Sequence, residues 1–314
     1  MTDQSKIPVP PSGPSLIERA SGSFDFRTMT RPPIADLPPA PKGVSAPVVQ
    51  PKPAAQFETT VPQVDPQPFR GVFHPIDRAH LREQCLIEPE SAVTGLLEEF
   101  RIVKRQLLRT AAESREGKGA PHGERILICS AHPGEGKTFC AVNLALSMAA
   151  EKDTEVLLVD ADFAKPSVLS TLGLPGGPGL MDALADPTMA VEDCIIGTDI
   201  AGLYVLPAGN ATGSDTEYLA STRTDVVLAR LTSHAPNRIV IFDSPPALAA
   251  SPASVLANHV GQTVVVVRAD VTGEAALRDA VHLLGACDDI KLLLNGTRFS
   301  TTGRRFGTYY GYKE

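Results

Sequence analysis

Residues 125–139 read RILICSAHPGEGKTF, and they decide the fold. The first six residues form an apolar run with the composition of a buried strand. A loop containing Gly134 and Gly136 then closes in Lys137 and Thr138, and an apolar helical stretch follows it. Glycines let the backbone turn its N–H groups toward phosphate oxygens, and the positive end of the helix favours the same anion. The stretch therefore predicts a phosphate-binding loop (P-loop).

The side chains of this loop have separate expected roles. Lys137 is expected to reach the β- and γ-phosphates of a nucleotide, and the Thr138 hydroxyl to bind Mg²⁺. Ala131 stands where the common G-x-x-x-x-G-K-[ST] pattern has its first glycine. The expected ligands are ATP and Mg²⁺. The residues predicted to bind the nucleotide here are Pro133, Gly134, Glu135, Gly136, Lys137, Thr138 and Phe139.

Apolar runs and helical stretches alternate along residues 125–295. Most of the runs are continuous rather than alternating, as in strands that are buried on both faces. This pattern predicts an α/β fold of the P-loop NTPase type, a mainly parallel sheet with helices on both faces. Ligands of such sheets bind outside the carboxyl ends of the strands. The predicted strands are 125–130, 155–160, 203–207, 238–243, 263–268 and 290–295.

Three acidic residues end two of these strands. Asp160 and Asp162 close the run VLLVDAD, and Asp243 closes RIVIFD. If the strands are parallel, their carboxyl ends lie at one edge of the sheet, so the three carboxylates can meet the nucleotide. Such acids suit metal ligation and activation of an attacking hydroxyl. We expect Asp162, then Asp160, to act as the base and Asp160 and Asp243 to serve Mg²⁺; a capping role is the alternative for Asp160 and Asp162.

The flanking segments differ from this central part. Sixteen of the 28 prolines lie in residues 1–75, which predicts a disordered linker. The expected domain spans 76–298, and its amphipathic helix covers about 90–112. Residues 299–314 are predicted to be a flexible tail. Three of the five tyrosines, Tyr309, Tyr310 and Tyr312, lie in this tail.

Composition and charge exclude several classes of protein. The net charge of −7 argues against a nucleic-acid partner. Five scattered cysteines without a CxxC pair indicate reduced thiols in a cytoplasmic protein rather than a disulfide framework or metal site. No stretch approaches the ~20 apolar residues that cross a bilayer. Any membrane association is therefore expected to be peripheral, through a partner at the inner membrane.

Taken together, these motifs resemble the bacterial tyrosine kinases, which belong to the MinD/ParA-like branch of P-loop ATPases. The matching stretches are PGEGKT at 133–138, LLVDAD at 157–162 and FDSPP at 242–246. The family also carries a Glu-x-x-Arg-x-x-Arg helix and a terminal tyrosine cluster. The resemblance covers residues 76–314. The stretches SLIERA at 15–20 and EEFRIVKRQLL at 98–108 look most like the exosortase-associated exopolysaccharide autokinases.

The resemblance implies an ATP-dependent protein-tyrosine autokinase that controls exopolysaccharide polymerisation and export. Its phosphoacceptors would be Tyr309, Tyr310 and Tyr312, modified in trans within a ring. Asn295 stands where relatives contact adenine; the alternative is a turn residue in the sequence NGT. The implied partners are a membrane polysaccharide co-polymerase (chain-length determinant) as activator and a cognate tyrosine phosphatase. The ring helix is matched by Glu98, Arg101 and Lys104.

Several positions depart from the family pattern. Ala164 replaces the usual basic residue after the second acid, and Lys165 follows it. Lys104 stands where the ring helix usually has Arg and lacks its bidentate geometry. His132 occupies the place of the signature lysine of partition ATPases. This last difference weighs against the alternative function, a MinD/ParA-like nucleotide switch without kinase activity.

Overall fold

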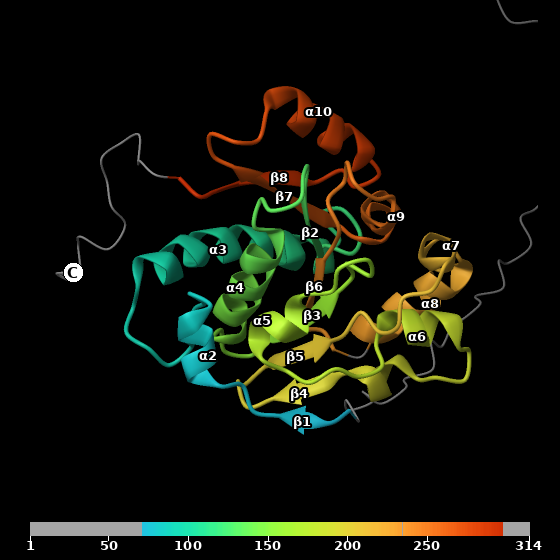
Figure 1. Ribbon diagram of the computed structural model, residues 1–314, viewed down its shortest axis with the longest axis horizontal. Helices are drawn as coiled ribbons and strands as arrows, with labels where there is room; N and C mark the ends of the chain where they lie inside the picture. Colours follow the sequence, from blue (N-terminus) through green and yellow to red (C-terminus); the bar gives the residue numbers. More distant parts are fainter. Residues whose placement is uncertain (1–70, 234, 298–314) are drawn as a thin grey trace, which may run out of the picture. The chain divides into compact units, whose positions relative to one another are not determined.

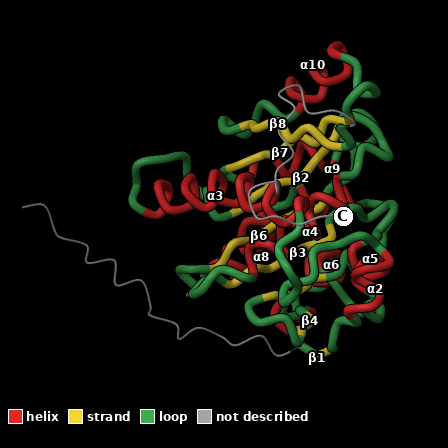
Figure 2. Tube along the Cα trace, turned by 90° about the vertical axis from the view of Figure 1, so that its left-hand side faces the viewer, coloured by secondary structure: helices red, strands yellow, loops and turns green. Residues whose placement is uncertain are grey.

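The computed structural model describes residues 71–297 except His234. Within this range the strands form one sheet in the order β1-β4-β5-β3-β6-β2-β7-β8. The strands are β1 (Phe73–His74), β2 (Arg125–Ser130), β3 (Glu155–Asp160), β4 (Ile196–Thr198), β5 (Leu203–Leu206), β6 (Arg238–Asp243), β7 (Gln262–Arg268) and β8 (Ile290–Asn295). Figures 1 and 2 show β7 and β8 at one end of the sheet, and β1 and β4 at the other.

Helices pack against both faces of this sheet. They are α2 (Arg78–Glu83), α3 (Gly95–Arg115), α4 (Lys137–Ala149), α5 (Val168–Leu172), α6 (Leu180–Ala185), α7 (Asp215–Leu219), α8 (Thr222–Thr232), α9 (Pro252–Leu256) and α10 (Glu274–Leu283). Two short 3₁₀ helices, η1 (Val191–Cys194) and η2 (Ala257–His259), complete the described elements. In the part of the sheet with the order β5-β3-β6-β2-β7-β8, all neighbouring strands are parallel. The predicted α/β fold with a mainly parallel sheet is confirmed.

The central strands are buried on both sides because alternate side chains enter different cores. In β2, Ile126 and Ile128 pack with α3 and α4, whereas Leu127 and Cys129 pack with the core that contains α6, α8 and α9. Figure 1 shows these two groups of helices on opposite sides of the strands. Continuous apolar runs are what such strands require.

Two short strands at the β1 end of the sheet were not predicted. β1 lies inside the segment 1–75 that was expected to be a linker, and it pairs parallel to β4. β4 in turn pairs antiparallel to β5. Two- and three-residue strands leave no apolar run in the sequence. The remaining linker prediction (1–70) and the tail prediction (298–314) lie outside the described residues.

Helix α3 confirms the predicted amphipathic helix and shifts its ends. The side chain of Thr94 accepts a hydrogen bond from the Leu97 N–H at 3.2 Å, so the helix begins after Thr94 rather than at 90. Among its buried residues are Leu97, Phe100 and Leu107, which pack in the same core as α4.

Lys104 occupies this buried stripe, which corrects its assignment to an assembly surface. Its side chain is 4% exposed; the ammonium donates to the Ser147 carbonyl at 2.7 Å and pairs with Glu151 at 2.6 Å. Both partners lie on or just after α4. Lys104 therefore joins α3 to α4 within one copy, while its neighbour Arg105 is exposed.

Replacing Lys104 and Arg105 with alanine separately should give opposite results. Lys104→Ala removes a buried hydrogen bond and an ion pair and should lower the free energy of unfolding by about 2 kcal/mol. Arg105→Ala should change it by less than about 0.5 kcal/mol, as exposed substitutions usually do. Chemical denaturation measures both values. Equal stability of the two variants would contradict the structural role of Lys104.

No helix in the described part of the chain is both long enough and apolar enough to cross a bilayer. All five cysteines are free thiols, and only Cys85 is exposed.

Candidate functional site

Strand register brings the predicted acids together at the carboxyl edge of the sheet. In the β3–β6 pair, Asp160 lies directly beside Asp243. Strand β2 lies on the other side of β6, and its carboxyl end leads into the P-loop. In the β7–β8 pair, Asn295 lies beside Arg268 at the same edge. The topology thus gathers residues that are far apart in the sequence.

The P-loop backbone requires its glycines. Gly134 and Gly136 have φ angles of 79° and 96°, in the left-handed region where a Cβ is strongly disfavoured. At Gly136 an added Cβ would also lie 2.2 Å from the Asn295 side-chain nitrogen. Gly136 caps α4, so the N–H groups of the first turn remain available to an anion at the helix N-terminus.

Lys137 lies among three carboxylates. Its ammonium contacts the Asp162 carboxylate at 2.8 Å. Burial lowers the pKa of Lys137, but Asp243, Asp162 and Asp160 outweigh that effect and leave the pKa above its ordinary value. Lys137 is therefore charged, and it is held next to the residue that we predicted as the base.

Thr138 and Asp243 form a site of hard oxygen donors. The Thr138 hydroxyl donates to one Asp243 oxygen at 2.6 Å and contacts the Ser167 hydroxyl at 3.2 Å. The other Asp243 oxygen is buried without a hydrogen-bond partner. An unpartnered buried carboxylate oxygen beside a hydroxyl fits Mg²⁺ that is also held by phosphate oxygens and water. The described residues contain no cluster of three or more His, Cys, Asp or Glu that alone could hold a metal ion.

The environment of Asp243 predicts a pH dependence of stability. Burial raises the pKa of Asp243 from 3.8 to about 7, although Lys137 and the Thr138 hydrogen bond oppose the shift. The folded protein therefore binds more protons than the unfolded chain between about pH 4 and pH 7, and this group destabilises the fold as the pH rises through that window.

We therefore expect the melting temperature of Asp243→Asn, relative to that of the unsubstituted protein, to increase as the pH rises from about 4 to about 7. Both proteins are measured without nucleotide or metal. Melting curves across this window measure the difference. The matched control is Asp279→Asn on α10, which removes an exposed carboxylate. A difference that stays constant with pH at Asp243 would contradict the raised pKa.

The two acids of β3 and its following loop have different surroundings. Asp160 accepts hydrogen bonds from the backbone N–H groups of Asp162, Ser167 and Val168 at 3.2, 2.8 and 2.9 Å. Burial raises the pKa of Asp160, and these hydrogen bonds oppose the shift. Asp160 thus has the capping role that the sequence left open. Asp162 accepts from the Lys165 N–H at 3.1 Å and from Lys137, so it is the acid that faces the P-loop lysine.

Residues without a recognisable motif brace the P-loop. The Glu135 carboxylate, 2% exposed, accepts from the His132 N–H at 3.0 Å and from the Thr272 hydroxyl. Arg268 donates to the Gly134 carbonyl at 2.7 Å, and Asn295 donates to the Glu135 carbonyl at 2.9 Å.

Of these bracing residues, only Asn295 and Glu135 were predicted site residues; the roles of Arg268, Thr272 and Ser167 were missed. The available signal was that Arg268 ends β7, while Thr272 and Ser167 lie in the segments that follow β7 and β3.

The remaining predicted residues are placed as follows. Pro133 is exposed on the P-loop, and Phe139 is half-buried against the α3–α4 core. Glu98 and Arg101 pair with each other on α3, three residues apart. Ala164 and Lys165 are both exposed beside Asp162. The tyrosines at 309, 310 and 312 lie outside the described residues.

This chain is similar in sequence to a known protein family and to known tyrosine kinases. The family described as AAA domain matches residues 123–291. The chain is 30% identical over 232 residues to the tyrosine-protein kinase YwqD of Bacillus subtilis (strain 168). That match covers 73% of this chain and 91% of YwqD.

Two further proteins are similar to this chain. The tyrosine-protein kinase wzc of Salmonella typhimurium (strain LT2) is 30% identical over 191 residues, which cover 60% of this chain but only 26% of wzc. The solved structure of the VpsO kinase domain has a TM-score of 0.50 and 29% identity, and covers 62% of this chain and 98% of that domain. The likeness therefore extends over nearly all of a kinase domain and about a quarter of the longer wzc protein.

Proposed function

This chain belongs to the AAA domain family and to the bacterial tyrosine kinases, and on that premise we propose that it phosphorylates tyrosines of its own sequence with ATP. It is a protein-tyrosine kinase by family. The observation that best supports the autokinase proposal is the meeting of Lys137, Asp162 and Asp243 at the carboxyl edge of the sheet. The chain also supplies an acceptor, in the tyrosines at 309, 310 and 312.

The proposed reaction moves one phosphoryl group. The tyrosine oxygen forms a bond to the γ-phosphorus of ATP, the bond from that phosphorus to the β–γ bridging oxygen breaks, and ADP leaves. Asp162 accepts the phenol proton. Lys137 turns from Asp162 toward the phosphates and stabilises the charge that develops there. Asp160 orders the loop between β3 and α5, so its role here is positioning.

Mg²⁺ fits beside Thr138 and Asp243, where it would neutralise charge on the phosphate oxygens when bound with ATP. The P-loop N–H groups and the N-terminus of α4 hold the phosphates. Asn295, with Arg268, keeps the loop in the required conformation through Glu135 and Gly134. We propose that Asn295 also lies close to the adenine, as the resemblance implies.

Transfer is proposed to take place between copies. Glu98 and Arg101 are partly exposed on α3, and Arg105 replaces Lys104 as the third residue of the assembly surface. A ring built through this helix would present each copy's tyrosines to its neighbour. Phosphorylation adds several negative charges to the tail, which favours its release from an acidic site.

The wider role is proposed from the family resemblance. A membrane polysaccharide co-polymerase would activate the kinase and hold it at the inner membrane, and a tyrosine phosphatase would reverse the modification. The output would be control of exopolysaccharide polymerisation and export. The relatives' names support the kinase activity; the polymer and the membrane partner are part of our proposal.

A mixing experiment in cells that contain any membrane activator tests the autokinase proposal. One copy carries Lys137→Met with an intact tail, and the other carries phenylalanine at 309, 310 and 312 with an intact site. Trypsin releases FGTYYGYK, residues 306–313, only from the first copy. Mass spectrometry should find phosphate on this peptide when both copies are present.

The controls separate the alternatives. Phosphate on the Lys137→Met copy expressed alone would show that another kinase modifies the tail. An unmodified tail in the unsubstituted protein, together with release of free phosphate from ATP, would overturn the proposal in favour of a nucleotide switch.

A further inference from the structure

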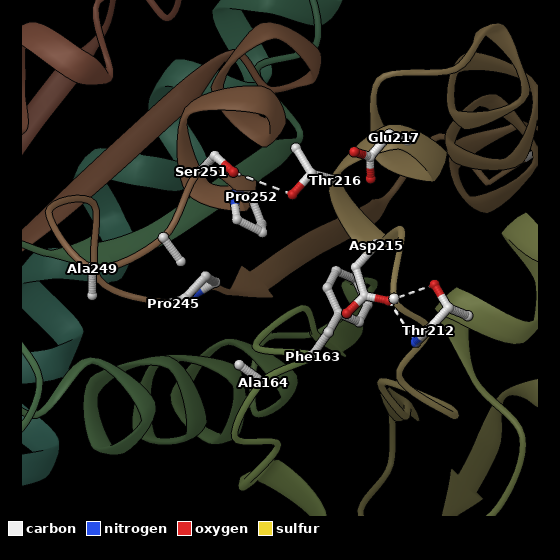
Figure 3. Close-up of a pocket in the computed structure, with 12 residues that line it drawn as sticks. Phe163, Ala164, Thr212, Asp215, Thr216, Glu217, Pro245, Ala249, Ser251 and Pro252 are labelled. Carbon is white, nitrogen blue, oxygen red and sulfur yellow. Dashed lines mark hydrogen bonds between the residues drawn. The ribbon is translucent and has the colours of Figure 1, made fainter.

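A cavity of about 480 Å³ opens next to the candidate site and is not used by it. Figure 3 shows that three segments line it: the residues just after β3, the loop after β6, and the start of α7. Phe163 and Ala164 directly follow Asp162, and Pro245 comes two residues after Asp243. The cavity is therefore lined by the segments that directly follow the proposed base and the metal-site carboxylate in the sequence.

The lining combines apolar walls with negative charge. Phe163, Ala164 and Pro245 form the apolar part of the lining (Figure 3); Ala164 is exposed, and Phe163 and Pro245 are buried. The charged lining residues are Asp215 and Glu217; no Lys, Arg or His lines the cavity.

The two lining acids differ in their partners. One Asp215 oxygen accepts from the Thr212 N–H at 2.7 Å and from the Thr212 hydroxyl at 2.8 Å. Glu217 is exposed and, among the residues the structure describes, has no hydrogen-bond or ion-pair partner. Its charge is therefore free to bind a cationic group of a ligand.

We propose that this cavity binds residues 303–313, GRRFGTYYGYK, of a second copy, and that Glu217 recognises Arg304 or Arg305. The inference rests on the proposed transfer between copies and adds the residues that select the acceptor. Charge supports this occupant: residues 298–314 carry four basic side chains and one acidic, in a chain of net charge −7. A tyrosine ring at the exposed Ala164 would lie against the segment that directly follows Asp162.

A binding experiment tests the proposal without needing catalysis. The probe is a fluorescein-labelled GRRFGTYYGYK peptide, and fluorescence anisotropy measures its Kd with Mg²⁺ and a non-hydrolysable ATP analogue. The protein is the full chain with Arg304→Glu and Arg305→Glu, so that its own tail does not compete for the cavity.

Glu217→Lys should raise the Kd of the peptide about five- to tenfold, because an attraction becomes a repulsion at a partly solvated site. The matched control is Glu83→Lys on α2, an exposed glutamate outside the cavity lining, which should leave the Kd unchanged. Ala249→Trp fills the exposed rim labelled in Figure 3 and should also weaken binding.

A charge exchange completes the test. The peptide GEEFGTYYGYK should bind the unsubstituted cavity weakly and recover affinity for a Glu217→Lys protein that keeps Arg304 and Arg305, because its own basic tail is then repelled and does not compete. Equal Kd values for Glu217→Lys and Glu83→Lys, equal binding of both peptides, or no binding at all would each overturn the inference.

The two proposals fail separately. Tail phosphorylation without cavity-dependent binding would support the autokinase proposal and exclude the cavity as the peptide-binding site. Cavity-dependent binding with a tail that is never phosphorylated would keep the peptide site and remove the autokinase.

Discussion

Lys137→Met is expected to reduce tyrosine phosphorylation at least about 100-fold. The lysine is the cation expected to stabilise the charge on the transferred phosphoryl group, and losing one such preorganised group typically costs about 10²–10³ in rate. Quantitative mass spectrometry of the 306–313 peptide, or transfer of labelled phosphate, measures the loss.

The structure also supplies controls for this experiment. Lys152→Met removes an exposed lysine that lines a different cavity, on the loop between α4 and β3, and should leave the rate unchanged. Lys137→Met leaves Asp162 and Asp243 without their shared cation, so its melting temperature must be recorded as well. A folded Lys137→Met protein that still modifies its own tail would exclude the proposed role of Lys137.

Asp162→Asn should lower kcat about 10²–10⁴-fold, the range expected when a general base is removed. Asparagine keeps the size of the side chain but does not accept the phenol proton at neutral pH. Affinity for ATP should change far less than kcat, because the loop N–H groups and Lys137 remain. Steady-state kinetics and nucleotide titration together separate the two effects.

Asp160→Asn is the informative comparison for Asp162→Asn. Asp160 receives three backbone N–H groups, so the amide variant should lose stability through the β3–α5 loop. A large fall in kcat for Asp160→Asn with unchanged stability, combined with a normal rate for Asp162→Asn, would exchange the two assignments.

The sequence predicted most of the central fold for a physical reason. Strands that are buried on both faces are apolar along most of their length, so runs such as RILICS and RIVIFD can be recognised as strands from the sequence. The edge strand β1 has two residues and no such run, and its pairing with β4 depends on tertiary contacts that no local pattern contains.

The predictable part of the candidate site consists of residues at or next to the ends of strands. The P-loop motif predicts Lys137 and Thr138 as site residues. The parallel strands place their carboxyl ends at one edge of the sheet, and this predicts Asp243 at the same site. Arg268 and Thr272 act through a loop carbonyl and through the Glu135 side chain, and their sequence context has no repeated spacing that marks such contacts.

Lys104 shows how a charge can mislead. It lies four residues after Phe100 and three before Leu107, so helical spacing places it on the buried stripe. An interpretation based on its charge alone placed Lys104 on the surface instead. A lysine with an apolar stem and two oxygen partners is accommodated there, and the tertiary partners on and after α4 were not visible in the local pattern.

The contact between Lys137 and Asp162 has a consequence for the order in which the two substrates act. The lysine contacts the carboxylate that is proposed to take the phenol proton. A tyrosine that enters first meets a base whose charge is already satisfied. Under the proposed mechanism the triphosphate would attract the lysine and free the carboxylate, so the acceptor would become reactive only after the nucleotide has bound.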